Sequence, residues 1–377
     1  MDFRDSPDEA QFRARLRAWL AGNVPPGGFP PEDQDRNSFQ MEWHRTLYKG
    51  GWIGLSWPRS VGGQELGPMY DAILNDELGA AGAPRAPSIG FLGRVILQHG
   101  TADQQAEYLP GLLSGTHQWC QGFSEPGAGS DLASLRTRAD RTDGGYVVNG
   151  QKVWTSRAQW SDYCLLLARS DPESTRHRGL SCFVVKTDTP GMTIRPIVQI
   201  SGDRQFCEVF YDAVFIPESQ RIGPEGEGWK LAMSTVAYER GPADIGAISN
   251  HKRTLAELQK LAATSGRPDA ARRVARCRVQ VEVLRLRVLA SLSERVRGGV
   301  PGPEGSVDKL LMAETDQLLA HTRMYLLGAA PLVGDAPEGL HDYFWSRAAT
   351  IYGGTAQIQK SIVAERVLGL PRATGRR

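Results

Sequence analysis

The spacing of apolar residues changes twice along the chain, near residue 118 and near residue 227. Before the first change the spacing is helical. Ser6 and Glu9 form a capping box around Pro7, which predicts where the first helix begins. Its apolar residues share one face: Phe12, Leu16, Trp19 and Leu20. Further helices are predicted at 38–48, 70–80 and 102–113, so residues 1–118 are expected to form an all-helical domain.

Between residues 119 and 226 the apolar runs shorten to strand length. The run 146–154 contains Asn149-Gly150, a strong hairpin signal, so the chain is expected to reverse direction there. Further strands are predicted at 164–167, 180–186, 192–197 and 208–215. The pattern predicts a small β-barrel or sandwich.

Helical spacing returns after the glycine-rich break at 223–228. The clearest helix is 272–297, whose apolar residues share one face: Val274, Val281, Leu284, Val288 and Leu292. We expect its arginines to form a solvated or intersubunit face: Arg272, Arg273, Arg276, Arg278, Arg285 and Arg287. Residues 227–377 are therefore predicted to form a four-helix bundle, and the fold class is α+β with three domains.

Composition limits the classes of function. The 377 residues are 41% hydrophobic and 23% charged, enough for two or three domain cores. A net charge of +2 gives no general attraction for nucleic acid. Charges interrupt the N-terminal segment, and no later stretch reaches membrane length, so we expect neither a signal peptide nor a membrane span and infer a cytoplasmic protein.

Several kinds of chemistry lack the residues that they need. The five cysteines are widely spaced with no CxxC pair, and they are expected to be reduced, buried and inert. The seven histidines include no close helical pair, so no metal site is predicted. The chain has neither a GxGxxG motif after a strand nor a Walker loop, which leaves a nicotinamide-binding domain or a P-loop ATPase unsupported.

Two polar segments carry the candidate chemistry. Residues 121–131 contain Gly-Ala-Gly-Ser, in which backbone N–H groups can approach a phosphate closely. Trp154 lies in the second segment and can wall a flat ring. The hydroxyl donors of the two segments are Ser124, Ser130, Thr155 and Ser156. Together they indicate a flavin, although for either segment alone a glycine-rich turn or an ordinary buried tryptophan is an equally good explanation.

A third segment makes the pattern specific. Residues 351–359 read Ile-Tyr-Gly-Gly-Thr-Ala-Gln-Ile-Gln, and with this segment the chain resembles the acyl-CoA dehydrogenase family of flavoenzymes over essentially its whole length. The resemblance implies FAD as cofactor, a thioester of coenzyme A or an acyl carrier protein as substrate, and an electron transfer flavoprotein as electron acceptor. Thr355 and Gln357 match residues that contact the adenosine part of FAD, often from a neighbouring subunit. A homo- or heterotetramer, or a dimer, is therefore expected.

The resemblance also implies roles for individual residues. Phe123 and Ser124 match contacts to the flavin pyrimidine, and Gly129 and Ser130 match residues near the pyrophosphate and the pantetheine arm. In the second segment, Trp154 is expected beside the ring and Ser156 near flavin N5, with Thr155 between them. The residues expected to bind substrate are Ser130, Tyr238, Arg240, Gly353 and Gly354.

The chain departs from the family in two places. Many relatives carry the catalytic base as glutamate in the sequence IYEGT, where this chain has Gly353. Glu239 matches the base position of relatives that act on branched or long acyl chains, and it is the predicted base; the alternative is that Glu239 and Arg240 belong to a structural ion-pair network on a long helix. An Arg-x-x-Phe-Gly motif that binds the FAD pyrophosphate is absent, and an arginine within 272–287 is the candidate substitute.

Three functions remain open at this stage. The first is FAD-dependent α,β-desaturation of an acyl thioester; the missing side chain at Gly353 favours a bulky or branched acyl group over a short one. The second is a flavin oxidase or monooxygenase on the same scaffold. The third is a non-catalytic subunit that completes the FAD site of a partner. The intact flavin segments favour the first two.

Overall fold

The computed structural model describes residues 4–26, 30, 33–87, 89–238, 242–298 and 302–372. The chain forms two compact units, each described by itself below. The bundle unit comprises residues 1–27, 66–86 and 240–377, and the sheet unit comprises residues 28–65 and 87–239. The three-domain boundaries expected from the sequence stay a prediction.

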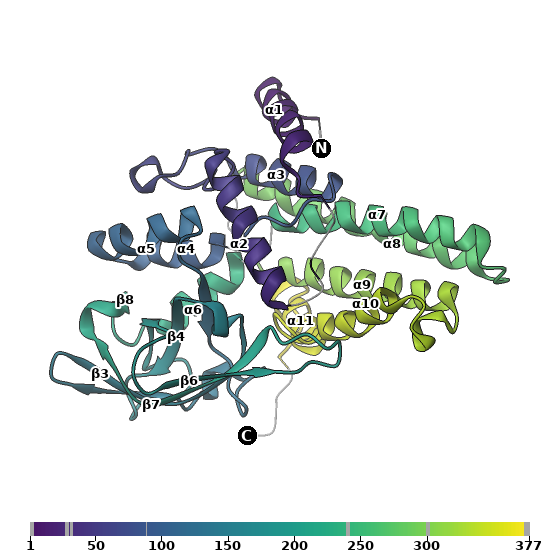
Figure 1. Ribbon diagram of the computed structural model, residues 1–377. Coiled ribbons are helices and arrows are strands. Elements are labelled where there is room, and N and C mark those ends of the chain that lie inside the picture. Colours follow the sequence, from purple (N-terminus) through teal and green to yellow (C-terminus); the bar gives the residue numbers. More distant parts are fainter. Residues whose placement is uncertain are drawn as a thin grey trace. The chain divides into compact units, whose positions relative to one another are not determined.

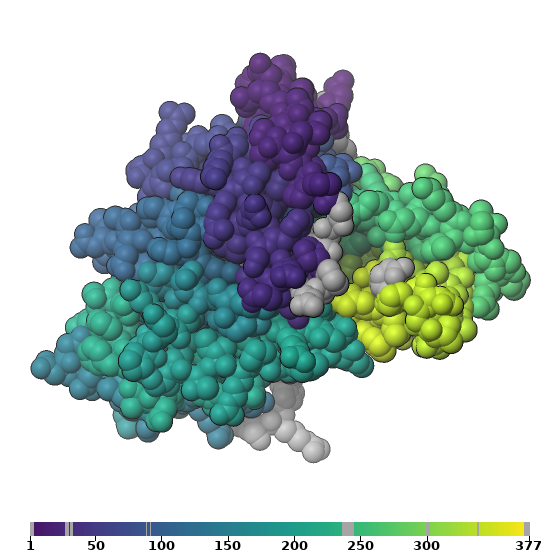
Figure 2. Space-filling model, viewed as in Figure 1, coloured from purple at the N-terminus to yellow at the C-terminus, as the bar shows by residue number. Residues whose placement is uncertain are grey.

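The bundle unit is helical. In the described residues its α-helices are α1 (Pro7–Asn23), α3 (Pro68–Ala80), α7 (Pro242–Thr264), α8 (Ala270–Val296), α9 (Gly305–Leu327), α10 (Pro337–Arg347) and α11 (Ala356–Ile362). Helices α7 to α10 lie side by side, with α7 on α3 and α8, and α9 on α8 and α10 (Figure 1). Figure 2 shows their side chains, green to yellow, packed closely against one another. The core between them includes Leu258, Cys277, Val281 and Leu319.

The start of α1 confirms the predicted capping box. The Ser6 N–H donates to Glu9 Oε2 at 2.7 Å, and the Glu9 N–H donates to Ser6 Oγ at 3.3 Å. Arg13 then bridges to α3, with its Nη1 2.6 Å from Oε1 of the buried Glu77. Arg17 donates to the same carboxylate at 2.7 Å. Two guanidinium groups therefore satisfy one buried carboxylate and join α1 to α3.

Helix α8 confirms the predicted stripe. All five of its predicted core residues are buried: Val274, Val281, Leu284, Val288 and Leu292. Arg272, Arg273, Arg276 and Arg278 are exposed, as expected for a solvated face. The other two arginines are half-buried: Arg285 pairs with Glu282 and Arg287 with Asp308, each at 2.7 Å.

The sheet unit combines four α-helices with one sheet in its described residues. The helices are α2 (Asp33–Lys49), α4 (Ile89–His99), α5 (Ala102–Ser114) and α6 (Gly228–Tyr238). Helix α4 was not predicted, because it contains two glycines within its first five residues. Gly93 is required by packing, because a Cβ atom there would lie 2.0 Å from the ring of Trp57. No helix in the described residues of the chain is long and apolar enough to span a membrane.

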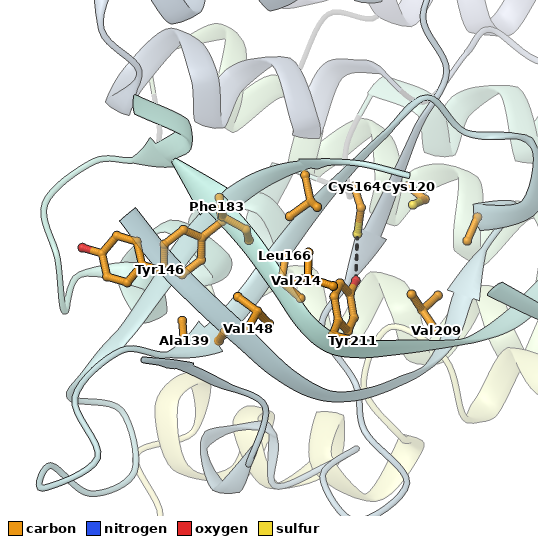
Figure 3. Packing of buried hydrophobic residues seen from close by; sticks show 14 of the residues in the cluster. Cys120, Ala139, Tyr146, Val148, Cys164, Leu166, Phe183, Val209, Tyr211 and Val214 are labelled. Atoms are coloured by element: carbon orange, nitrogen blue, oxygen red, sulfur yellow. Dashed lines mark hydrogen bonds between the residues drawn. The ribbon is translucent and has the colours of Figure 1, made fainter. Parts of the chain in front are cut away.

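The strands are β1 (Trp119–Gly122), β2 (Arg138–Thr142), β3 (Gly145–Ser156), β4 (Tyr163–Arg169), β5 (Leu180–Lys186), β6 (Met192–Ile197), β7 (Phe206–Pro217) and β8 (Arg221–Ile222). Strands β3 to β7 lie on the predicted runs and extend several of them, whereas β1, β2 and β8 were not predicted. The strand order is β6-β7-β3-β2-β4-β5-β8, and β1 pairs with β4 in parallel. Tyr146, Phe183 and Tyr211 pack in the core of this sheet, where the Tyr211 hydroxyl lies 3.6 Å from Cys164 Sγ (Figure 3). All five cysteines are free and buried, as predicted.

The predicted hairpin at Asn149-Gly150 is wrong. Strand β3 runs without reversal from Gly145 to Ser156, and the tight turn lies earlier, between Thr142 and Gly145. Opposite Asn149, β7 contains one extra residue: Val148 pairs with Val214, whereas Gly150 pairs with Tyr211. Asn149 Oδ1 accepts the N–H of Ala213 in this bulge at 2.9 Å. The Asn-Gly pair therefore lies opposite a bulge in β7, which Asn149 supports through its side chain, and it does not turn the chain.

Gly150 is needed there because the residue just before β2, Thr137, approaches closely. We expect Gly150→Ala to destabilise the fold by about 1–3 kcal/mol in urea unfolding, because the new Cβ atom would lie 2.5 Å from Thr137 Oγ1 and 2.7 Å from its Cα. The control is Gly90→Ala in α4, which meets no described atom within 4 Å. Equal stability of the two variants would contradict this account of the bulge.

Candidate flavin site

The structure brings the first two predicted segments together. Phe123 follows β1 directly and is 5% exposed. The next residue, Ser124, accepts the N–H of Val153 through its carbonyl oxygen at 2.9 Å. The loop that begins at Phe123 therefore runs beside the end of β3, which carries Trp154 and Ser156.

The loop presents hydrogen-bond donors outward. The backbones of Glu125 and Ala128 bond to each other at 3.0 and 3.1 Å and close a tight turn. Gly127, Gly129 and Ser130 are exposed, and a Cβ atom on either glycine would meet no described atom within 4 Å. Within the described part of the chain, the N–H groups of Gly127 and Gly129 bond to nothing. An exposed turn with such N–H groups suits a phosphate.

A second bulge turns the end of β3 outward. Lys152 pairs with Val209 but Thr155 pairs with Cys207, so β3 contains one extra residue here. Trp154 adopts φ +60° at this bulge and is 57% exposed, which excludes an ordinary buried tryptophan. Ser156 is exposed as well. The Trp154 indole and the Ser156 hydroxyl are therefore both exposed at the end of β3.

Thr155 faces the opposite way. Its side chain has no exposed surface, and its hydroxyl is buried without a hydrogen-bond partner among the described residues. Ser156 is therefore the hydroxyl of this pair that a ligand at the surface meets. A role for the Thr155 side chain in holding the cofactor stays a prediction.

A buried ion pair that the sequence did not predict connects the two segments. Lys152 is fully buried, and its Nζ lies 2.8 Å from Glu125 Oε1 and 3.0 Å from the Phe123 carbonyl oxygen. The Glu125 carboxylate also accepts the N–H groups of Arg136 at 2.7 Å and Thr137 at 2.8 Å. One signal in the sequence was Lys152 itself. It lies two residues before Trp154, in a strand whose side chains alternate between the inside and the outside.

The protonation of this pair follows from its contacts. Burial alone would raise the pKa of Glu125, but the Lys152 charge and the donated hydrogen bonds outweigh it and hold that pKa below its usual value. Burial lowers the pKa of Lys152, and the Glu125 charge opposes this effect. Each group therefore keeps the other charged in a dry environment.

The third predicted segment lies in the bundle unit. Gly353 and Gly354 have φ values of +61° and +86°, and Thr355 caps α11 by accepting the Ile358 N–H at 3.2 Å. Gln357 is exposed. Gln359, which the sequence analysis did not single out, is 2% exposed and donates from Nε2 to the Gly353 carbonyl at 2.9 Å. Gln359 therefore fixes the shape of the two-glycine loop.

The predicted base lies in a segment that the structure does not describe. Glu239 and Arg240 lie outside the described residues, as does the side chain of Tyr238 at the end of α6. The roles of these three residues stay predictions. Among the described residues, no group of three or more histidine, cysteine, aspartate or glutamate side chains is arranged to hold a metal ion.

Three family models match successive parts of the chain. The N-terminal domain of acyl-CoA dehydrogenase matches residues 6–116, its middle domain matches 120–214, and its C-terminal domain matches 226–368. The middle-domain match includes both segments of the sheet unit described above. The C-terminal match includes the two-glycine loop.

Whole-length relatives agree with these matches. Acyl-CoA dehydrogenase IpdE1 of Mycobacterium tuberculosis is 38% identical over 97% of this chain and 98% of its own length. The solved structure of the Tcur3481–Tcur3483 steroid ACAD is 30% identical, with a TM-score of 0.84 over 99% of this chain and 100% of that chain. The ChsE4–ChsE5 complex from Mycobacterium tuberculosis gives a TM-score of 0.82 at 30% identity, with the same coverage.

The site fits the cofactor of this family. The N–H groups of Gly127 and Gly129, which have no partner among the described residues, suit the phosphates of FAD, and the exposed Trp154 and Ser156 suit its ring and polar edge. All three domain types occur in order, and relatives match from end to end. The chain therefore belongs to the acyl-CoA dehydrogenase family of FAD-dependent oxidoreductases.

Proposed function

We propose that this acyl-CoA dehydrogenase desaturates the α,β bond of a bulky acyl thioester and that Glu239 is its catalytic base. The observation that carries the proposal is Gly353, which stands where many relatives have glutamate. A Cβ atom at Gly353 would meet no described atom within 4 Å. At position 353 the two-glycine loop therefore leaves open space where many relatives have a carboxylate.

The reaction needs a base in a dry site. The α C–H of a thioester is a weak acid, so a carboxylate must be positioned beside it with a raised pKa. Glu239 takes this proton in the proposal. Bound FAD would supply the acceptor for the hydride that leaves the β carbon. Trp154 and Ser156 hold the cofactor's ring in place, and the electrons pass to an electron transfer flavoprotein.

A bulky acyl group is supported by two observations. The absent side chain at Gly353 leaves room beside the two-glycine loop. A solved structure that is 30% identical over nearly the whole chain is named a steroid ACAD. We therefore propose a polycyclic or branched acyl chain, carried by coenzyme A or an acyl carrier protein, as the substrate class.

The outer face of α8 supports an oligomer. Val279, Val283 and Leu286 lie on one face of the helix, opposite its core residues, and are 64%, 45% and 50% exposed. Three neighbouring apolar side chains of this kind are typical of a protein contact. The proposed partner is a second copy or a related dehydrogenase chain, since the similar ChsE4–ChsE5 structure is itself a complex.

A non-catalytic subunit of such a complex is the second candidate function. The glycine at 353 and the two-chain relatives favour it. The outward donors at Gly127, Gly129 and Ser156 favour a chain that binds FAD itself. A purified chain that stays colourless after soaking with FAD, and turns over only with its partner, would support the second candidate.

The base is tested by Glu239→Gln. This variant is expected to keep its fold and flavin but to lose at least ~100-fold in the rate of flavin bleaching on anaerobic mixing with acyl thioesters, because glutamine cannot take a proton. Glu227→Gln is the matched control, since Glu227 is exposed and pairs only with Lys230 in the described structure.

A second variant tests whether the base has moved. Adding Gly353→Glu to Glu239→Gln returns a carboxylate to the common family position, and we expect partial recovery toward small acyl thioesters. The recovery is limited because glutamate at φ +61° costs about 1–2 kcal/mol. Bleaching of Glu239→Gln at the parent rate would show that another group takes the proton.

Ser156 and Thr155 are tested as a pair. We expect Ser156→Ala to weaken FAD binding roughly five- to tenfold, the effect of losing one hydrogen bond of about 1 kcal/mol. Thr155→Val should leave the FAD Kd unchanged, because its buried hydroxyl has no partner to lose in the described structure. Titration with FAD measures both, and a larger loss in Thr155→Val would reverse the assignment.

The α8 face is tested by light scattering. Val283→Asp places a charge among exposed apolar residues, and we expect it to lower the molar mass of the assembly in solution. Ala263→Asp, exposed on α7, is the control and should leave the mass unchanged. An unaltered mass in Val283→Asp would remove this face from the proposed interface.

A further inference from the structure

The buried pair of Lys152 and Glu125 has no assigned part in the proposed reaction, yet it connects the two segments proposed to hold the flavin. Lys152 lies two residues before Trp154, and Glu125 follows Phe123 and Ser124 directly. Both side chains are buried, Lys152 completely. A lysine near a glycine-rich loop suggests a phosphate ligand, but this ammonium group reaches no surface and has two partners inside the protein.

The contacts join three places in the chain. Lys152 Nζ donates to the Phe123 carbonyl and to Glu125, and the adjacent Val153 N–H donates to the Ser124 carbonyl. Residues 123–125 are thus fixed to residues 152–153. The Glu125 carboxylate extends the connection to the far end of the loop through the N–H groups of Arg136 and Thr137. One carboxylate therefore holds the start and the end of the loop against β3.

Stability alone is a weak reason for such a pair. Removing two charges from water costs about as much as their attraction returns, and a pair of apolar side chains would fill the same space as well or better. What an ion pair adds is a defined geometry, because the ammonium and carboxylate must meet at one distance and in one orientation. Here that geometry fixes the position of Phe123 and Ser124 relative to the end of β3, which carries Trp154 and Ser156.

We propose that Lys152 and Glu125 are positioning residues for the flavin, which fix the loop that begins at Phe123 against the bulged end of β3. This inference rests on the proposed function, since it takes Trp154 and Ser156 as the flavin contacts. Neither residue touches the cofactor in the proposal. They act through the Phe123 and Ser124 carbonyls and the Val153 amide.

The decisive variant is Lys152→Met with Glu125→Gln. Lys152→Met alone leaves a buried carboxylate without its counterion and is expected to lower the melting temperature and to weaken FAD binding together. The double variant removes that stranded charge, while the amide oxygen introduced at position 125 still accepts from a backbone N–H, so the melting temperature should largely recover. The bond to the Phe123 carbonyl is still missing, so FAD binding should stay at least ~10-fold weaker than in the parent.

Three measurements on the full chain separate the outcomes: melting temperature, FAD Kd and hydrogen exchange of the Val153 amide without added FAD. We expect the double variant to recover its melting temperature, exchange Val153 faster and keep a raised Kd. A parent-like Kd in the double variant would overturn the inference, because the pair would then serve stability alone. A parent protein that binds no FAD contradicts the proposed function before any variant is compared.

The conservative variant provides a further control. Glu125→Asp keeps the charge but shortens the reach to the N–H groups of Arg136 and Thr137, so the loop should shift with the ion pair retained. We expect a changed flavin absorption spectrum with a nearly unchanged melting temperature. A spectrum identical to that of the parent would also count against a positioning role.

Discussion

The contact between the Lys152 ammonium and the Glu125 carboxylate, 2.8 Å long and fully enclosed on the lysine side, is the constraint on which the candidate site depends. It lies where β2, β3 and the glycine-rich loop meet. Around it, two backbone N–H groups donate to the carboxylate and a backbone carbonyl accepts from the ammonium. A loop of small residues, flexible by composition, thereby acquires a fixed position beside a strand.

The bulge at the end of β3 determines which side chains face a ligand. Along this strand Val148 and Lys152 point inward, and regular alternation would turn Trp154 and Ser156 inward too. One extra residue between Lys152 and Thr155 reverses the alternation, so Thr155 is buried while Trp154 and Ser156 are exposed. The φ of +60° at Trp154 is the local cost of this reversal. The bulge therefore places both side chains at the surface.

The bundle unit contains a two-glycine loop whose shape is fixed by its backbone angles and by one glutamine. Its two-glycine loop has left-handed backbone angles at Gly353 and Gly354, and Gln359 holds the loop through a carbonyl rather than through a side chain. The loop keeps a defined shape although it carries no carboxylate. The shape of the loop therefore does not depend on a carboxylate at position 353.

The sequence by itself determined the family and those elements whose apolar spacing or capping is most regular. Regular apolar spacing predicted α8 and its core residues, the capping box predicted the start of α1, and three short motifs indicated the flavin enzymes, because each depends on residues close together in the chain. Asn149-Gly150 misled because an asparagine that accepts a hydrogen bond from a bulge in β7 and a glycine that admits a neighbouring segment are also the residue types of a turn, and only the strand pairing distinguishes the two cases. The tertiary structure decided that Lys152 meets Glu125, that Thr155 is enclosed and that Trp154 is exposed. These facts depend on strand register and on contacts between residues far apart in sequence, which local pattern does not encode.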